Sequence, residues 1–273
     1  MKFAVFAKFK NEGRDRILAR AGPTAGNFSP SNSEAELTIT LTKEKCMILE
    51  RSNSINLNKL QTQLSGVANR PDIEELSKMI KMYQLYQAGQ REISTKLENL
   101  DAEFQVNYDY NPIHHMESRM KDVQSLVQKA ERKGYELTAD SIQANIYDIA
   151  GIRVITNYMD DIYNVEKLLT HQTDVTLLRR KDYIKHPKES GYRSLHIVVK
   201  VPVFQAKGPI DVPVEIQIRT VGMDMWASLE HKLRYKTDTN QELVDKYGDQ
   251  LKGYADELEQ IERGMQGIHK ELI

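Results

Sequence analysis

Two carboxylates, Glu215 and Asp148, each lie in or next to a short apolar segment that could hold the side chain in a metal site. Glu215 lies in the segment 212–220, where Val and Ile alternate with other residues, so the acid falls on the opposite face of a strand. Asp148 stands directly before the apolar run 149–155, in which Gly151 allows a close backbone approach. Such carboxylates suit a Mg²⁺ ion. A solvent-facing strand and a helix-terminating Asp would show the same patterns.

A basic stretch precedes a glycine-containing segment that carries an aromatic residue. Tyr192, Ser194 and His196 share one face of this predicted strand. Cations bind phosphates and an aromatic ring offers a platform for a base, so the combination suits a nucleotide. A solvated basic loop is the alternative. The cations of the stretch are Arg179, Arg180, Lys181, Lys185, His186 and Lys188.

A third segment has the features of a phosphate site at the start of a helix. Arg119 and Lys121 lie on one side of an extended segment, and Asp122 can cap the helix that follows. Ser125 then falls in the first turn, where free backbone N–H groups and the helix dipole attract anions. An ordinary capped helix with a solvated basic entrance would look the same.

These segments need elements that hold them together. Apolar residues three or four apart predict a long helix from Asp72, with Glu75 three residues on as in a capping box. Short apolar segments and helices then alternate, which predicts an α+β fold: a mixed β-sheet flanked by helices, with long helices towards both ends. The predicted elements are a short apolar segment at 111–121, helices at 123–133, 138–147 and 160–169, and strands at 152–156, 176–179, 194–201 and 212–219.

Residues 1–70 differ from the rest of the chain in composition. The stretch 22–33, rich in Gly, Pro and Ser, predicts a loop or linker, and the strict alternation at 37–42 predicts a half-buried strand. A partly disordered or dispensable extension is the alternative. We therefore expect an N-terminal extension over 1–70, a main domain with the candidate site over 71–240 and a C-terminal amphipathic helix over 241–273.

The C-terminal segment has the most regular apolar pattern in the chain. Its apolar residues step by three and four alternately, like the a/d seam of about three heptads, with charged flanks. Such a stripe can pack back on its own domain, but a seam two residues wide favours a helix from another subunit. We therefore expect a homo-oligomer, such as a tetramer, built through this helix. The seam consists of Leu251, Tyr254, Leu258, Ile261, Met265, Ile268 and Leu272.

Composition narrows the class of protein. With 38 basic and 39 acidic side chains among 273 residues, overall charge predicts neither a nucleic-acid nor a membrane partner, so an anion site must be a local cluster. The single cysteine, Cys46, excludes an intramolecular disulfide and a multi-cysteine zinc site. No stretch approaches the ~20 apolar residues of a membrane span, and no signal-peptide core is found. We expect a soluble, cytoplasmic protein with no membrane partner.

Five motifs, in their order and spacing, resemble the synthetase domain of RelA/SpoT homologues, specifically the small alarmone synthetases. The resemblance implies a nucleotidyltransferase-like synthetase fold and transfer of the β,γ-diphosphate of ATP to the ribose 3′-OH of GDP or GTP, which gives (p)ppGpp. The His-Asp dipeptide of the family's hydrolase half is not found, so synthesis without hydrolysis is implied. The motifs are DIAGIR from Asp148, KDYI from Lys181, GYRSLH from Gly191, EIQIRT from Glu215 and MWASLEHK from Met225.

The resemblance also implies roles on the ATP side. Arg119 and Arg153 match the pair that sandwiches the adenine, and Lys121 and Ser125 match the donor-phosphate contacts. One residue departs from the family, which commonly has Ser where this chain has Asp122. Asp can still cap the helix, but it adds a negative charge near the donor phosphates.

The two carboxylates are implied to be the catalytic centre. Asp148 and Glu215 match the pair associated with Mg²⁺, and Glu215 also matches the residue that activates the acceptor 3′-OH. Charge agrees with these roles, because two polyphosphates repel each other unless a metal and cations neutralise them. A ribose hydroxyl is a poor nucleophile, so a nearby carboxylate helps to remove its proton.

On the acceptor side, Tyr192 matches the residue that stacks on the guanine. The residues that match the acceptor-phosphate side are Lys181, Lys185, Lys188, Arg193 and His196. Further residues expected in the site wall are Gln217, Arg219, Glu230 and His231.

The loop before Tyr192 leaves the acceptor open. It reads Lys-Glu-Ser-Gly-Tyr over 188–192, where the family often has Lys-Pro-Asn-Gly-Tyr. Loss of Pro loosens the loop, and Glu189 weakens a phosphate site. One alternative is therefore a toxic relative that pyrophosphorylates the 3′ end of tRNA. Another is a non-catalytic module that binds RNA or a nucleotide, against which the paired carboxylates argue.

Overall fold

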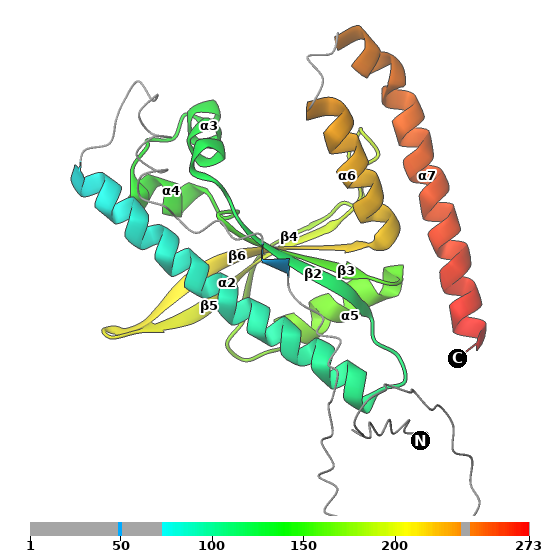
Figure 1. Cartoon of the computed structure of the whole chain (residues 1–273), viewed down its shortest axis with the longest axis horizontal. Helices are drawn as coiled ribbons and strands as arrows, with labels where there is room; N and C mark the ends of the chain where they lie inside the picture. Colours follow the sequence, from blue (N-terminus) through cyan, green and yellow to red (C-terminus); the bar gives the residue numbers. More distant parts are fainter. Residues whose placement is uncertain (1–48, 51–72, 236–240, 273) are drawn as a thin grey trace, which may run out of the picture. The chain divides into compact units, whose positions relative to one another are not determined.

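The computed structural model describes residues 49–50, 73–235 and 241–272 (Figure 1). They belong to one compact unit that runs from Cys46 to Ile273. The predicted loop at 22–33, the strand at 37–42 and the cap at Asp72 lie outside the described residues. The expected boundaries near residues 70 and 240 stay predictions.

A mixed sheet forms the centre of the described part. Its parallel pair, β3 with β6, brings together strands far apart in sequence, and β2, β5 and β4 join by antiparallel pairing. The two-residue strand β1 (Leu49–Glu50) pairs parallel with β2 at the edge. The predicted α+β class is confirmed. In sheet order the five longer strands are β2 (Ile113–Met120), β3 (Ala150–Thr156), β6 (Gly208–Thr220), β5 (Leu195–Gln205) and β4 (Thr176–Asp182).

Strands β5 and β6 form a hairpin that is longer than the alternation predicts. The two strands turn directly into one another, and Gly208 has a φ of 118°, a conformation that favours glycine. The outer end of the hairpin carries exposed residues such as Phe204 and Ile210. The strands were predicted only at 194–201 and 212–219. The apolar alternation stops there because only the inner part of the hairpin packs on the core.

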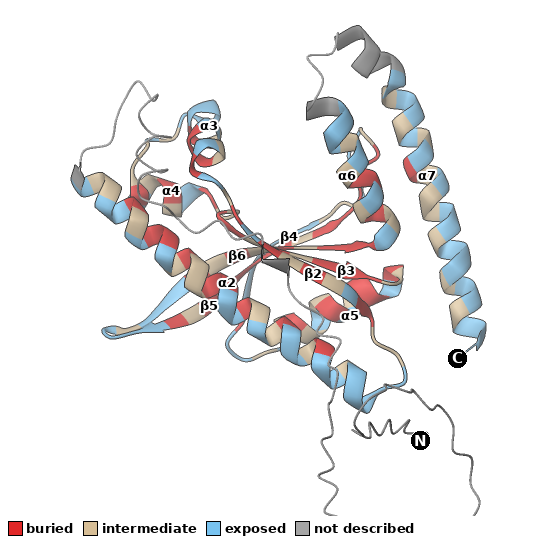
Figure 2. Cartoon of the chain, in the orientation of Figure 1, coloured by how far each residue is buried: buried red, intermediate tan, exposed pale blue. Residues whose placement is uncertain are grey.

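One face of the sheet is covered by α2 (Ile73–Asn107) and α5 (Met159–Thr170), as Figure 1 shows. Val212, one of the alternate apolar residues of β6, meets α2 at Gly89, where an added Cβ would lie 2.6 Å from the valine Cγ1. The alternate residues Val212, Val214, Ile216 and Ile218 are fully buried in this core (Figure 2). The intervening residues of β6 therefore face the other side of the sheet.

Two short helices pack on the same core cluster as α2. Helix α3 (Val123–Lys133) has the predicted bounds, and Asp122 caps it by accepting a hydrogen bond from Ser125 N at 2.8 Å. Helix α4 (Ala139–Asn145) ends two residues before the predicted 147. Its end is earlier because Ile146 is buried with an extended backbone, which turns the chain towards Asp148.

Helices α6 (Val221–Tyr235) and α7 (Gln241–Leu272) lie side by side (Figure 1). Helix α6 was not predicted, because it follows β6 without a loop. The predicted C-terminal seam is divided between two environments. Leu251 and Leu258 pack against Trp226 of α6, whereas the rest of the seam is exposed. Among the described residues, no helix is long and apolar enough to span a membrane.

Candidate active site

Strand pairing aligns the candidate residues in two rows across the second face of the sheet. Since paired residues point to the same side of a sheet, each row is a line of neighbouring side chains. The first row runs through Arg119, Gly151, Glu215, Val198 and Arg179. The second row runs through Glu117, Arg153, Gln217, His196 and Lys181.

Asp148 sits between two lysines. Lys121 Nζ lies 3.0 Å from its Oδ2 and Lys129 Nζ lies 2.7 Å from its Oδ1. Burial alone would raise the pKa of Asp148, but the hydrogen bonds and charges of Lys129 and Lys121 outweigh it and lower the pKa. The carboxylate is therefore ionised at neutral pH.

Glu215 is the second carboxylate of the site. Gln217 Nε2 donates to its Oε2 at 2.9 Å, and His196 Nδ1 lies 3.6 Å from its Oε1. Burial and the charge of Asp148 act to raise the pKa of Glu215, but the contacts with His196 and Gln217 hold it below the ordinary value. Both carboxylates thus carry charge close to one another.

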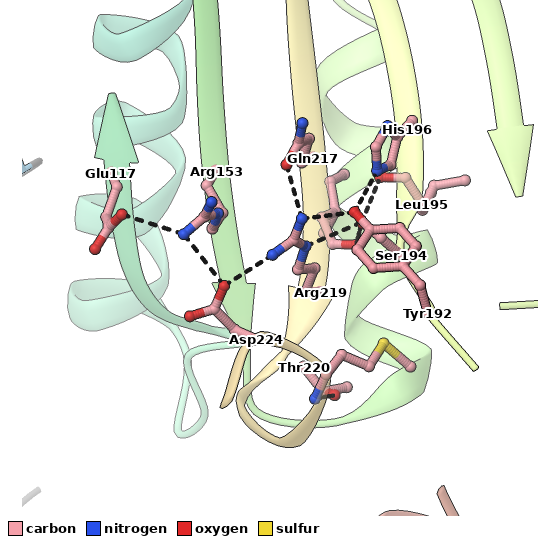
Figure 3. Close-up of polar contacts among 12 residues, drawn as sticks. Glu117, Arg153, Tyr192, Ser194, Leu195, His196, Gln217, Arg219, Thr220 and Asp224 are labelled. Carbon is pink, nitrogen blue, oxygen red and sulfur yellow. Dashed lines mark hydrogen bonds and ion pairs between the residues drawn. The ribbon is translucent and has the colours of Figure 1, made fainter. Parts of the chain in front are cut away.

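Arg219 connects Gln217, the partner of Glu215, to the aromatic residue Tyr192 (Figure 3). Its Nη2 donates to Tyr192 Oη at 2.6 Å and to Gln217 Oε1 at 2.9 Å. The tyrosine oxygen, which accepts this bond, lies 2.7 Å from His196 Nε2. The other ring nitrogen of His196, Nδ1, faces Glu215, so the imidazole links the tyrosine hydroxyl to the carboxylate. These five side chains form a closed ring of polar contacts.

Arg153 lies beside this ring. Its Nη1 contacts Glu117 Oε2 at 3.4 Å and Asp224 Oδ1 at 3.3 Å, and Asp224 also accepts from Arg219 (Figure 3). Burial first, and then the charge of Arg219, lowers the pKa of Arg153. Its Nε is buried without a hydrogen-bond partner. Arg119, on the next strand, is exposed and lies on the same face.

The lysines of the basic stretch divide between two places. Lys188 Nζ lies 4.5 Å from the centre of the Tyr192 ring, and Lys181 pairs with His196 across the strands. Lys185 is turned instead towards α5, where its Nζ lies 5.5 Å from the centre of the Tyr163 ring. The structure thus brings two of the three predicted lysines beside Tyr192 and His196.

A cavity of about 420 Å³ adjoins the row of Glu215. Val198 and Pro213, which flank Glu215 on the same face, contribute to its wall. Two cations, Arg179 and Lys200, line it as well, and the guanidinium of Arg179 lies 5.1 Å from the centre of the Tyr147 ring. The rest of its wall includes Leu85 and Tyr86 of α2, and neither Asp148 nor Glu215 lines it, so the cavity lies next to the row of Glu215 and outside the pair of carboxylates.

Comparison with known proteins identifies the class of enzyme. Residues 118–240 match the model of a region found in RelA and SpoT proteins. The GTP pyrophosphokinase YwaC of Bacillus subtilis is 41% identical over 180 residues, which cover 66% of this chain and 85% of YwaC. The chain belongs to the RelA/SpoT-type small alarmone synthetases.

Solved structures of the family agree. The small alarmone synthetase 1 of Bacillus subtilis bound to its product pppGpp is 35% identical, with a TM-score of 0.62, and the match covers 68% of this chain and 93% of that one. The same enzyme bound to AMPCPP is 31% identical, with a TM-score of 0.56 and the same coverage.

Three residues expected in the site of this alarmone synthetase lie away from the ring. Arg193 is buried, and its guanidinium points to α7 instead of towards Tyr192 and Lys188. Glu230 and His231 lie in the second half of α6, and His231 is exposed.

Two functional candidates were missed from the sequence. Lys129 forms an ion pair with Asp148. It follows Ser125 by four residues and so lies on the same face of α3, and this spacing could have predicted Lys129 as a site residue. Asp224, which joins Arg153 to Arg219, stands in the first turn of the unpredicted helix α6. No local pattern marks Asp224, because both of its partners come from other elements.

Proposed function

We propose that this chain is a GTP pyrophosphokinase that transfers the β,γ-diphosphate of ATP to the ribose 3′-OH of GDP or GTP. The single observation that carries the proposal is the pair of ionised carboxylates, Asp148 and Glu215, close together on a sheet face lined with cations. Two like charges close together are costly. A site that only binds a nucleotide gains nothing from such a pair, whereas metal-assisted transfer uses both carboxylates.

The reaction follows from the position of Glu215. The acceptor 3′-oxygen attacks the β-phosphorus of ATP, the bond from that phosphorus to the bridging oxygen of the α-phosphate breaks, and AMP leaves. The hydroxyl proton passes to Glu215, whose lowered pKa keeps it ready to accept at neutral pH. Gln217 and His196 hold its two oxygens in place.

The donor side is proposed to lie between β2 and α3. Lys121 and Lys129 supply positive charge, and the first turn of α3 supplies the Ser125 hydroxyl and the positive end of the helix dipole. Arg119 and Arg153 lie on the same face of neighbouring strands, where two guanidinium planes can bracket an adenine. The relative that binds AMPCPP supports a nucleotide donor in this family.

Mg²⁺ fits the carboxylates. No cluster of three or more metal-ligating side chains occurs among the described residues. Asp148 and Glu215, about one-fifth exposed, nevertheless offer the oxygen donors that Mg²⁺ uses when waters and substrate phosphates complete its shell. When bound between them, the ion would neutralise the charge that develops on the transferred diphosphate.

The acceptor is proposed to lie over Tyr192, Lys188 and His196. The ring of Tyr192 can stack on guanine, and Lys188 Nζ lies 4.5 Å from its centre, within reach of a bound phosphate. GTP is supported as an acceptor by the relative whose product is pppGpp. The need for ATP and GTP, together with the single Cys46, favours a cytoplasmic location.

A homo-oligomer is proposed to form through α6 and α7. Helix α6 exposes an apolar stripe at every fourth residue, from Val221 to Leu233, each 44–56% exposed. Helix α7 exposes the free part of the seam beside it, including Ile261 and Ile268. Exposed apolar area of this extent marks an interaction surface.

The test incubates the full chain and Mg²⁺ with ATP labelled in the β- and γ-phosphates, offering GDP, GTP, GMP and deacylated tRNA separately. We expect label on GDP or GTP, and a fall of at least about a hundredfold in Glu215→Gln with the fold retained. Lys207→Gln, on the distant hairpin turn, is the control. No labelled nucleotide, or full activity in Glu215→Gln, would refute the proposal, and label on tRNA alone would identify the toxic class.

A further inference from the structure

Arg193 is held by the C-terminal helix. Its side chain is 8% exposed, and its Nη2 lies 2.6 Å from Asp256 Oδ1 and 3.0 Å from Glu259 Oε2 of α7. Its Nη1 donates to Gly191 O at 3.0 Å. A buried guanidinium between two carboxylates is a strong, directional contact. The segment around Tyr192 is thereby tied to a helix more than 60 residues further along the chain.

Gly191 makes the same contact through its backbone. Its φ is 91°, and a Cβ at this position would lie 3.0 Å from Ala255 Cβ and 3.1 Å from Lys252 Cα. The loop and the α7 backbone therefore approach more closely than any side chain allows. Tyr192 stands between Gly191 and Arg193, so both of its chain neighbours are fixed by α7.

Apolar contacts complete the attachment. Tyr192 and Leu251 pack against the buried cluster of Trp226, Ala227 and Ala255. Trp226 Nε1 donates to Leu251 O at 2.9 Å, which joins α6 to α7 at the same place. Through Tyr192 the cluster is joined to the ring of polar contacts that runs through His196 to Glu215.

We propose that α7 is a clamp that positions the acceptor side of the site, with Asp256 and Glu259 as its positioning residues. This inference rests on the proposed function. It expects α7 to affect binding of the acceptor nucleotide and not binding of the donor. The donor residues Arg119, Lys121 and Ser125 lie on β2, at its end and on α3, and Lys121 and Ser125 contact Asp148 and Asp122, which are not part of α7. Without the two carboxylates, the buried charge of Arg193 loses both of its ion pairs and keeps the hydrogen bond to Gly191 O, and the loop rearranges to solvate it.

The experiment measures the dissociation constants of GTP and of AMPCPP, each with Mg²⁺, so that it does not depend on turnover. The double variant Asp256→Asn/Glu259→Gln is compared with wild type and with Glu257→Gln, which removes an exposed carboxylate from the same helix. Trp226, the only tryptophan of the chain, reports the position of α7 by its fluorescence. We expect GTP binding to weaken by about tenfold or more and AMPCPP binding to stay within about twofold.

The readouts separate the clamp from the activity. Weaker GTP binding with a red-shifted Trp226 emission, and wild-type behaviour of Glu257→Gln, supports the clamp. Equal loss of GTP and AMPCPP binding, or unchanged GTP binding, overturns it. If the double variant does not fold, the same two dissociation constants are measured for Asp256→Asn alone. This variant should fold, because the Asp256 carboxylate is half exposed. Absence of product from wild type would refute the proposed reaction and leave these binding constants valid.

Discussion

At the scale of single residues, Tyr192 combines two separable contacts. Its ring faces Lys188 and packs on the Trp226 cluster, whereas its hydroxyl joins Arg219 to His196. The ring is the part that can stack on a base. The hydroxyl holds the ring of His196, which in turn faces Glu215.

Two substitutions at Tyr192 should therefore differ. Tyr192→Phe keeps the ring and removes the hydrogen-bond partner of His196 Nε2, so we expect kcat to fall about tenfold with little change in the KM for GTP. Tyr192→Ala removes the ring, and we expect that KM to rise by about tenfold or more. Steady-state rates at saturating ATP measure both. The same KM in the two variants would contradict separate roles for ring and hydroxyl.

At the scale of elements, α2 can lie against β6 only because Gly89 has no side chain. Val212 Cγ1 occupies the space where a Cβ would stand. The neighbouring Gln90 is buried, and its Nε2 donates to Arg119 O at 2.8 Å and to Gly151 O at 2.9 Å. The helix thereby fixes the two strands that carry the donor-side arginines.

The contact predicts that Gly89→Ala destabilises the fold. Val212 or the helix must shift, and we expect the free energy of unfolding to fall by about 1–3 kcal/mol. Gly267→Ala is the matched control, because this glycine lies in helix α7 with nothing within 4 Å of its added Cβ, and it should be neutral or stabilise by up to about 1 kcal/mol. Urea denaturation measures both. Equal stability of Gly89→Ala and wild type would show that α2 does not depend on this close approach.

At the scale of the whole molecule, α7 presents two sides. One side holds the loop before β5, and the other exposes Tyr254, Ile261, Met265 and Ile268. A surface of this kind beside the exposed stripe of α6 is suited to a second copy of the chain.

We predict that Ile261→Glu/Ile268→Glu dissociates the oligomer, because two buried charges oppose association. Light scattering after size exclusion should show an oligomer for wild type and a monomer for the variant. Val106→Glu changes an even more exposed apolar residue, on α2, and should leave the assembly intact. A wild-type monomer at micromolar concentration would contradict the proposed assembly.

The sequence by itself determined the features that depend on local spacing. The bounds of α3, the cap at Asp122 and the two faces of β6 follow from residues close together in the chain, and the structure confirms them. The family motifs predicted an α+β synthetase for the same reason, since each motif is a short continuous segment.

Only the tertiary structure decided which long side chains meet. Asp224 links two arginines from different strands, Lys185 turns towards α5, and Arg193 faces α7. The division of the α7 seam also could not be predicted from the sequence. The periodicity of a helix shows that it has an apolar side, but it does not show what covers that side. Such contacts join residues far apart in the chain, and their geometry exists only after the strands have paired and the helices have packed.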